Sequence, residues 1–170
     1  MLTTPHRALL LLLTAVVPLG ACVKKAAQEL GTGTAAPAPV LPPFEQEIAS
    51  FKATLTLPGA WKYGYRMVER ADTLYGAFRA VEFHYTADTA AGVPSRLLMV
   101  IRAFRKPAWE KLRASKKDVA RLLAEHEGVV YAFSVIPSSP YPAGSASTLR
   151  VDQMMPPIVA EPTALRLTFK

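Results

Sequence analysis

The chain has 170 residues, of which 51% are hydrophobic and 15 are prolines, and its formal net charge is +7. This length predicts one folded domain with room for an extra segment. A single cysteine excludes an intramolecular disulfide framework. No recognised nucleic-acid motif accompanies the basic charge, so we expect no nucleic-acid partner.

The start of the chain has the proportions of a secretory signal peptide. A short, weakly positive stretch at residues 5–7 precedes an apolar run at residues 8–19. That run is shorter than the ~20 residues that a helix needs to span a bilayer. A short apolar run near an N-terminus is typical of export signals. The sequence therefore predicts export, with residues 1–21 as the signal peptide.

The only cysteine follows this run directly. Leu19-Gly20-Ala21-Cys22 resembles the bacterial lipobox, an aliphatic residue and two small residues before a cysteine. The resemblance implies cleavage before Cys22 and a covalent N-terminal lipid on its thiol; we expect no other cofactor. Stable anchoring takes two acyl chains, which a diacylglyceryl group supplies. In the Gram-negative pattern, the absence of Asp after the cysteine implies the outer membrane. The alternative is an ordinary signal peptide with an incidental cysteine.

Residues 22–43 read as the lipidated cysteine and a Pro/Ala-rich tether. Gly, Ala, Thr and Pro dominate this stretch, a composition typical of partly extended linkers. At ~3 Å per residue the tether reaches roughly 60 Å at most. Residues 44–170 are enough to bury one core and are expected to form a single domain.

Alternation of apolar and polar residues predicts several strands in this domain. Residues 96–104 are apolar on both faces through Ile101, as expected of a central strand. The expected strands are residues 51–57, 63–69, 79–86, 96–104, 129–136 and 165–169.

Helix signals are fewer. Pro107 suits the first turn of a helix whose inward side would carry Trp109 and Leu112. Residues 149–159 could form another short helix, with Met154, Met155 and Ile158 packed inward. The proline pair at 156–157 would have to interrupt or end it.

Residues 116–128 fit either a helix or a hairpin. Residues 115–118 read as a capping box, followed by Val119, Leu122 and Leu123 at helical spacing. Gly128, after the sequence Glu-His-Glu, instead indicates a hairpin turn. The turn also argues against a metal site at His126, since zinc needs three or four converging ligands.

The order of these elements predicts the α+β class, an antiparallel sheet of about five to seven strands with one to three short helices packed on one face. The pattern is similar to small secreted bacterial domains of uncharacterised function and, more distantly, to the Mog1/PsbP-like α/β sandwich. This resemblance implies a binding or accessory module and transfers no catalytic residue. The segments that carry it are Leu57-Pro58 with Trp61, Phe83-His84-Tyr85, Met99-Val100-Ile101 running to Trp109, residues 125–131, and Pro140-Tyr141-Pro142.

The strongest charge feature is the segment 102–121. It contains eight cations and only two acidic residues, Glu110 and Asp118, a surplus of six positive charges. The mature chain, with 19 basic and 13 acidic side chains, has the same surplus. Such a segment attracts anions, and the envelope offers lipid phosphates, lipopolysaccharide and acidic glycans. The alternative is a solvated helix face. The candidate anion-binding residues are Arg102, Arg105, Lys106, Lys111, Arg113, Lys116, Lys117 and Arg121.

Two further candidates remain. Glu82 and His84 lie two apart on one strand face, where a carboxylate could orient an imidazole as a base, but no serine lies in a Gly-x-Ser-x-Gly setting. The Pro-rich loop 137–145 carries Tyr141 and is either a recognition loop or a rigid crossover loop with this ring packed on the sheet edge.

These observations predict a membrane-anchored envelope protein whose domain is a binding or accessory module. The alternatives are a small hydrolase that uses Glu82 and His84, and a structural subunit of an envelope complex with a protein partner.

Overall fold

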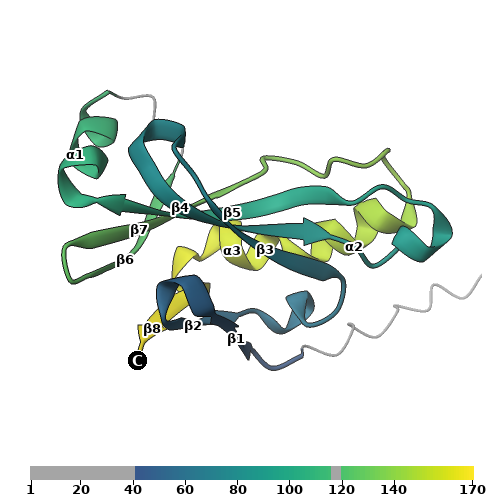
Figure 1. The fold of residues 1–170 in the computed structure, drawn as a ribbon. Helices are drawn as coiled ribbons and strands as arrows, with labels where there is room; N and C mark the ends of the chain where they lie inside the picture. Colours follow the sequence, from purple (N-terminus) through teal and green to yellow (C-terminus); the bar gives the residue numbers. More distant parts are fainter. Residues whose placement is uncertain (1–40, 116–119) are drawn as a thin grey trace, which may run out of the picture. The chain divides into compact units, whose positions relative to one another are not determined.

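The alternating segments form strands that assemble into two antiparallel sheets, and short helices complete an α+β fold (Figure 1). The computed structural model describes residues 41–115 and 120–170. The chain divides into two compact units, residues 1–37 and 38–170. Within the described residues, the core comes from the second unit, and we expect that unit to fold on its own.

The larger sheet has five strands, and its centre is the strand with apolar residues on both faces. Each of its strands pairs antiparallel with its neighbours. Their order across the sheet is β3 (Tyr65–Ala71), β4 (Ala77–Tyr85), β5 (Arg96–Arg105), β7 (Val129–Val135) and β6 (Arg121–His126).

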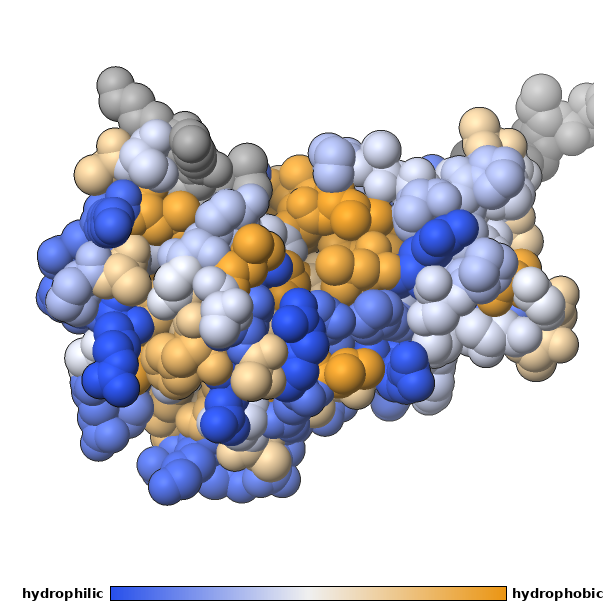
Figure 2. All heavy atoms as spheres, turned by 45° about the horizontal axis from the view of Figure 1, so that its top comes forward, coloured by the Kyte–Doolittle hydropathy of each residue, from blue (hydrophilic) through white to orange (hydrophobic). Residues whose placement is uncertain are grey.

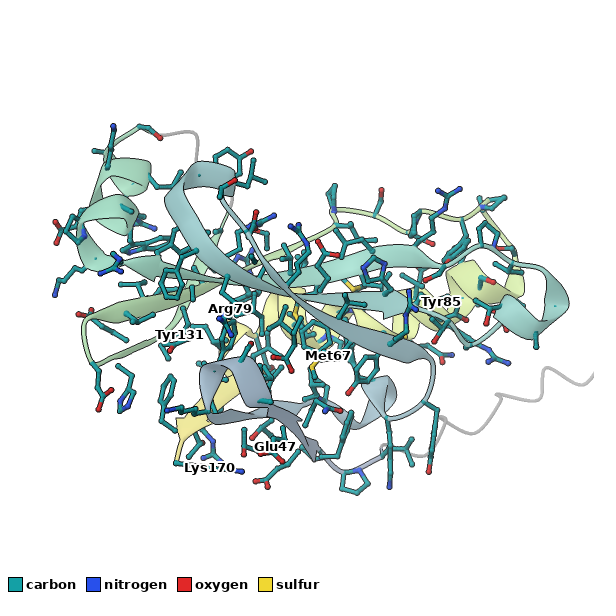
Figure 3. The ribbon with its side chains drawn as sticks, viewed as in Figure 1. Glu47, Met67, Arg79, Tyr85, Tyr131 and Lys170 are labelled. Atoms are coloured by element: carbon teal, nitrogen blue, oxygen red, sulfur yellow. The ribbon has the colours of Figure 1, made fainter. Side chains whose placement is uncertain are left out.

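The smaller sheet brings the start of the domain next to residues near position 170. β2 (Ala53–Leu57) lies between β1 (Phe44–Ile48) and β8 (Arg166–Phe169). An ion pair between Lys170 and Glu47, 2.6 Å from Nζ to Oε1, lies across the same strands (Figure 3). The sequence had not indicated β1, because its alternating Glu residues make an exposed edge strand rather than an apolar segment.

The main core fills the space between the inner face of the larger sheet, the smaller sheet and two helices. α2 (Ala146–Met154) and α3 (Pro156–Ala160) cover this face. Met154, Met155 and Ile158 are buried, as the sequence predicted. The proline pair divides the expected helix in two, because a proline inside a helix removes a backbone hydrogen bond.

A second, smaller core lies on the opposite face of the same sheet. Trp109 and Leu112 of α1 (Lys106–Ala114) pack there against Phe104 of β5 and Val130 of β7. Successive residues of a strand point to opposite faces, so Phe104 faces α1 while Ala103 faces the main core. Two helices thus cover one face, as expected, and α1 covers the other.

The helical interpretation of the stretch that follows α1 is wrong for residues 121–126. They form β6, which pairs with β7 through the register Glu125 to Val130 and His126 to Val129. The strands are joined by a tight turn in which Glu127 (φ 49°) and Gly128 (φ 74°) both have positive φ, as a two-residue hairpin turn of type I′ requires. Leu122 is 55% exposed rather than packed beneath a helix. Val119 and residues 116–118 lie outside the described residues.

Candidate functional site

Helix α1 lies beside the tip of the β3–β4 hairpin, where the turn η3 (Leu74–Gly76) joins the two strands (Figure 1). A cavity of about 430 Å³ lies between the two elements and is lined by Tyr75, Gly76, Ala108, Lys111, Leu112 and Ser115. We call this surface the α1 end and define it by Leu74, Tyr75, Ala108 and Lys111.

Three of the predicted anion-binding residues are engaged by other groups. Arg102 Nε lies 2.8 Å from Asp72 Oδ2, and Lys106 Nζ lies 2.8 Å from Glu125 Oε1. Arg121 donates from Nη1 to the backbone carbonyl of Val159 at 2.9 Å. The chain passes from strand to helix to strand, so cations that are close in sequence point in different directions. They therefore do not form one helix face.

Lys111 lies at the α1 end. It is exposed, as is Arg105 at the end of β5, and neither has an ion-pair partner among residues 41–115 and 120–170. Arg105 lies opposite Val129, which packs against the main core, so Arg105 belongs to the other face of the sheet. The guanidinium of Arg113 lies 5.7 Å from the ring centroid of Trp109, within the range of a cation–π contact. Glu110 is the acidic residue of α1. Lys116 and Lys117 lie outside the described residues.

Apolar side chains are exposed at the same end. Leu74 is 46% exposed and Tyr75 is 55% exposed. Tyr75 also has a positive φ of 58°, which is uncommon for a bulky residue because its Cβ approaches the backbone. In Figure 2, hydrophobic residues lie among strongly hydrophilic ones at the end that carries α1. The α1 end thus combines positive charge with apolar surface.

A buried carboxylate fixes the hairpin tip. Asp72 Oδ1 accepts a hydrogen bond from the Leu74 amide at 3.0 Å, while Oδ2 accepts one from Arg102. Arg70 Nη1 lies 3.7 Å from the same carboxylate. Burial alone would raise the pKa of Asp72, but the Leu74 amide and the two arginines outweigh burial and lower it. The side chain is therefore ionised at neutral pH and holds η3 in place.

We expect Gly76→Ala to destabilise the domain more than Gly92→Ala does. Both glycines have similar positive φ values, 82° and 80°, so both variants carry the left-handed backbone penalty of about 1–2 kcal/mol. A Cβ on Gly76 would also lie 3.3 Å from the Cβ of Ala108, whereas one on Gly92 meets nothing within 4 Å. Urea unfolding of both variants measures the difference, and equal destabilisation would show that η3 does not rest on α1.

Glu82 and His84 do lie on one strand face, but the Glu82 carboxylate is already paired with two other side chains. His84 Nε2 lies 3.0 Å from Glu82 Oε2, and Arg70 Nη2 lies 2.7 Å from Oε1. Burial raises the pKa of Glu82, but His84 and Arg70 outweigh this effect and lower it. Ser134 lies two strands away, opposite Val100, which in turn lies opposite Glu82. At about 4.8 Å per strand, that hydroxyl lies well outside hydrogen-bonding distance of the pair.

The geometry of Tyr141 favours the crossover interpretation of its loop. Its side chain is buried, and its hydroxyl donates to the Pro94 carbonyl at 2.9 Å. The ring packs edge-on against Tyr85 with centroids 5.4 Å apart; Figure 3 labels Tyr85 on β4. Thr148 of α2 donates to the Pro142 carbonyl at 2.8 Å. The loop is therefore held on both sides, and Tyr141 contributes to packing.

Two other cavities had no signal in the sequence, because each forms where distant segments meet. One, of about 390 Å³, lies between the crossover loop and helices α2 and α3; its lining includes Ile136, Pro137, Asp152, Met155 and Val159. The other, of about 420 Å³, lies where the two sheets meet; its lining includes Phe51, Phe78, His126, Tyr131 and Phe169.

Cys22 lies outside the described residues. Within residues 41–115 and 120–170, no group of three or more His, Cys, Asp or Glu side chains could hold a metal ion. No helix in this part of the chain is both long and apolar enough to cross a membrane. No family model matches the chain, and no curated protein or solved structure matches it significantly.

Proposed function

We propose that this chain is an exported lipoprotein, anchored to the cell envelope by a lipid on Cys22, and that its domain is a non-enzymatic binding or accessory module. The lipobox-like stretch directly after a short apolar run supports the anchor. Its pattern favours the outer membrane. A tether of this length reaches roughly 60 Å at most, whereas a domain of this size has a radius of gyration of about 14 Å. Any side of the domain can therefore face the membrane.

The partner that we propose is an anionic envelope component, bound at the α1 end. The observation that carries this assignment is the exposure of Lys111, beside Tyr75, without an ion-pair partner in the described part of the chain. Cations without partners give a positive potential that extends over about a Debye length, ~8 Å at physiological salt. Hydrolysis is less well supported, because Arg70 neutralises Glu82.

The anchor is tested with Cys22→Ala in the full chain. The variant should carry no lipid label and should release no mature form, because the thiol accepts the lipid and the cut falls directly before this cysteine. Ala21→Gly keeps a small residue before the cysteine and should be processed normally. The measurements are metabolic lipid labelling and the mass of the mature N-terminus. Membrane retention of the wild-type chain without lipid mass on that terminus would refute the anchor.

Anion binding is tested separately on residues 38–170. We expect this unit to bind immobilised phospholipid, lipopolysaccharide or acidic glycan more weakly as salt increases, because salt screens exposed charges. Lys111→Glu should weaken binding, whereas Lys62→Glu, an exposed lysine in another part of the domain, should not. Association that does not respond to salt would contradict the proposed binding function.

A further inference from the structure

Exposed apolar groups and the cation of Lys111 share the α1 end. Leu74 and Tyr75 are about half exposed, and Tyr75 and Lys111 line the same cavity. We propose that the α1 end binds the surface of an anionic phospholipid bilayer. Leu74 and Tyr75 enter the headgroup region while Lys111 meets the lipid phosphates. This inference rests on the proposed function, because the tether keeps the domain at a membrane.

The apolar part of the surface matches the chemistry of a bilayer interface. Tyrosine is enriched at membrane–water interfaces because its ring is apolar and its hydroxyl is polar. Leu74 adds an aliphatic side chain at the same turn, and water surrounds about half of its surface in the free domain. Entry into the headgroup region would remove both side chains from water.

The charged part of the surface is the reason that we propose an anionic bilayer. Lysine and arginine near an acidic leaflet attract lipid headgroups, and their long apolar stems can lie along the acyl chains while the charge stays among the phosphates. Lys111 is available for this role, because it is exposed and has no ion-pair partner in the described part of the chain. Arg102 and Lys106, in contrast, are held by Asp72 and Glu125.

The hairpin tip is already shaped in the free domain. The Asp72 carboxylate fixes the Leu74 amide, and Gly76 allows the turn to lie close to Ala108 of α1. A surface that is already ordered loses little conformational freedom on binding. A soluble acidic glycan could pair with Lys111, but it would leave Leu74 in water. A bilayer meets both groups at once.

The direct test uses a tryptophan at the tip. Tyr75→Trp in residues 38–170 is mixed with vesicles of phosphatidylglycerol and phosphatidylcholine, or of phosphatidylcholine alone. We expect the emission to shift to shorter wavelength, and lipids with brominated acyl chains to quench it, with the anionic vesicles only. Trp61 and Trp109, 0% and 9% exposed, are present in every variant, so the emission of the unsubstituted domain with the same vesicles is subtracted as background.

A matched position controls for nonspecific contact. Tyr63 is 73% exposed and has a lysine beside it, Lys62 Nζ lying 5.8 Å from the ring centroid. Tyr63→Trp should show no shift. In a sedimentation assay, Lys111→Ala should lower vesicle binding about fivefold, the factor expected for one cation near an anionic surface. Lys62→Ala should leave binding unchanged.

The outcomes separate this inference from the proposed function. Vesicle binding without an emission shift in the Tyr75→Trp variant would overturn insertion while leaving anion binding intact. Binding to lipopolysaccharide or acidic glycan but not to vesicles would overturn the bilayer as partner. Vesicle binding that does not depend on Lys111 would overturn the role of the α1 end. None of these results bears on the lipid label at Cys22, which tests the anchor alone.

Discussion

Replacing Trp61 with alanine is expected to lower the free energy of unfolding of residues 38–170 by about 3–5 kcal/mol. Trp61, in the turn η2 (Gly59–Trp61), has no exposed surface. Its ring packs edge-on against Phe83 with centroids 6.2 Å apart, and its Nε1 donates to the Met154 carbonyl at 2.7 Å. The substitution would leave a large cavity and also a buried carbonyl without its donor.

Urea unfolding measures this loss. Trp61→Phe keeps most of the volume but not the donor, so it should be destabilised by a smaller amount. Tyr63→Ala, two residues away and largely exposed, should change stability by no more than about 0.5 kcal/mol. If Trp61→Ala were as mild as this control, then η2 and α2 would not share a core.

The second large effect is expected at the hairpin tip, where Asp72→Ala should cost about 3 kcal/mol. The side chains of Asp72 and Arg102 are only 5% and 13% exposed, so the variant leaves a largely buried guanidinium without its partner. The double variant Asp72→Ala/Arg102→Met removes both charges and should recover much of the loss. If the double variant is no more stable than the single one, the ion pair is not the cause.

The same carboxylate predicts how stability depends on pH. The pKa of Asp72 is lower in the folded domain than its ordinary value of 3.8, so the folded state favours the ionised form. Its contribution is present above the unfolded pKa and is lost as pH falls through the folded pKa. Asp72→Asn, which does not titrate, should therefore show a smaller loss of stability than the wild type in acid. Urea midpoints measured from pH 6 downward, at about one-unit steps, test this.

The sequence predicted the strands and helices correctly where one face of a strand or one side of a helix is buried. β5 is apolar on both faces because α1 covers one side and the main core lies on the other. Residues 121–126 were ambiguous because Leu122 and Leu123 fit both periods, and the pairing partner that decides between them, β7, follows only after the turn. β1 was missed because an edge strand needs few apolar residues.

The candidate site was harder to predict, because its parts come from separate segments. The sequence indicated the cations but not the surface to which they belong, since the direction of each side chain depends on the strand or helix that carries it. Nothing in the sequence marked Leu74 and Tyr75 as part of a functional surface, because only the folded hairpin places them beside α1. Tyr141 has the composition of a recognition residue, and only its contact with Tyr85 shows that it is buried.

The smaller sheet has a consequence for the time at which the domain can fold. β2 lies between β1 and β8, with Ala53 opposite Phe169, so this sheet joins residues at opposite ends of the domain. Pairing across so long a stretch of chain is slow, because the entropy of closing the loop is lost before the contact forms. Until β8 has been synthesised, Leu55 and the core beneath it lack one neighbouring strand. We therefore expect the chain to remain incompletely folded until nearly all of the domain has been made, a delay that would suit the export we propose, in which the chain crosses a membrane before it folds.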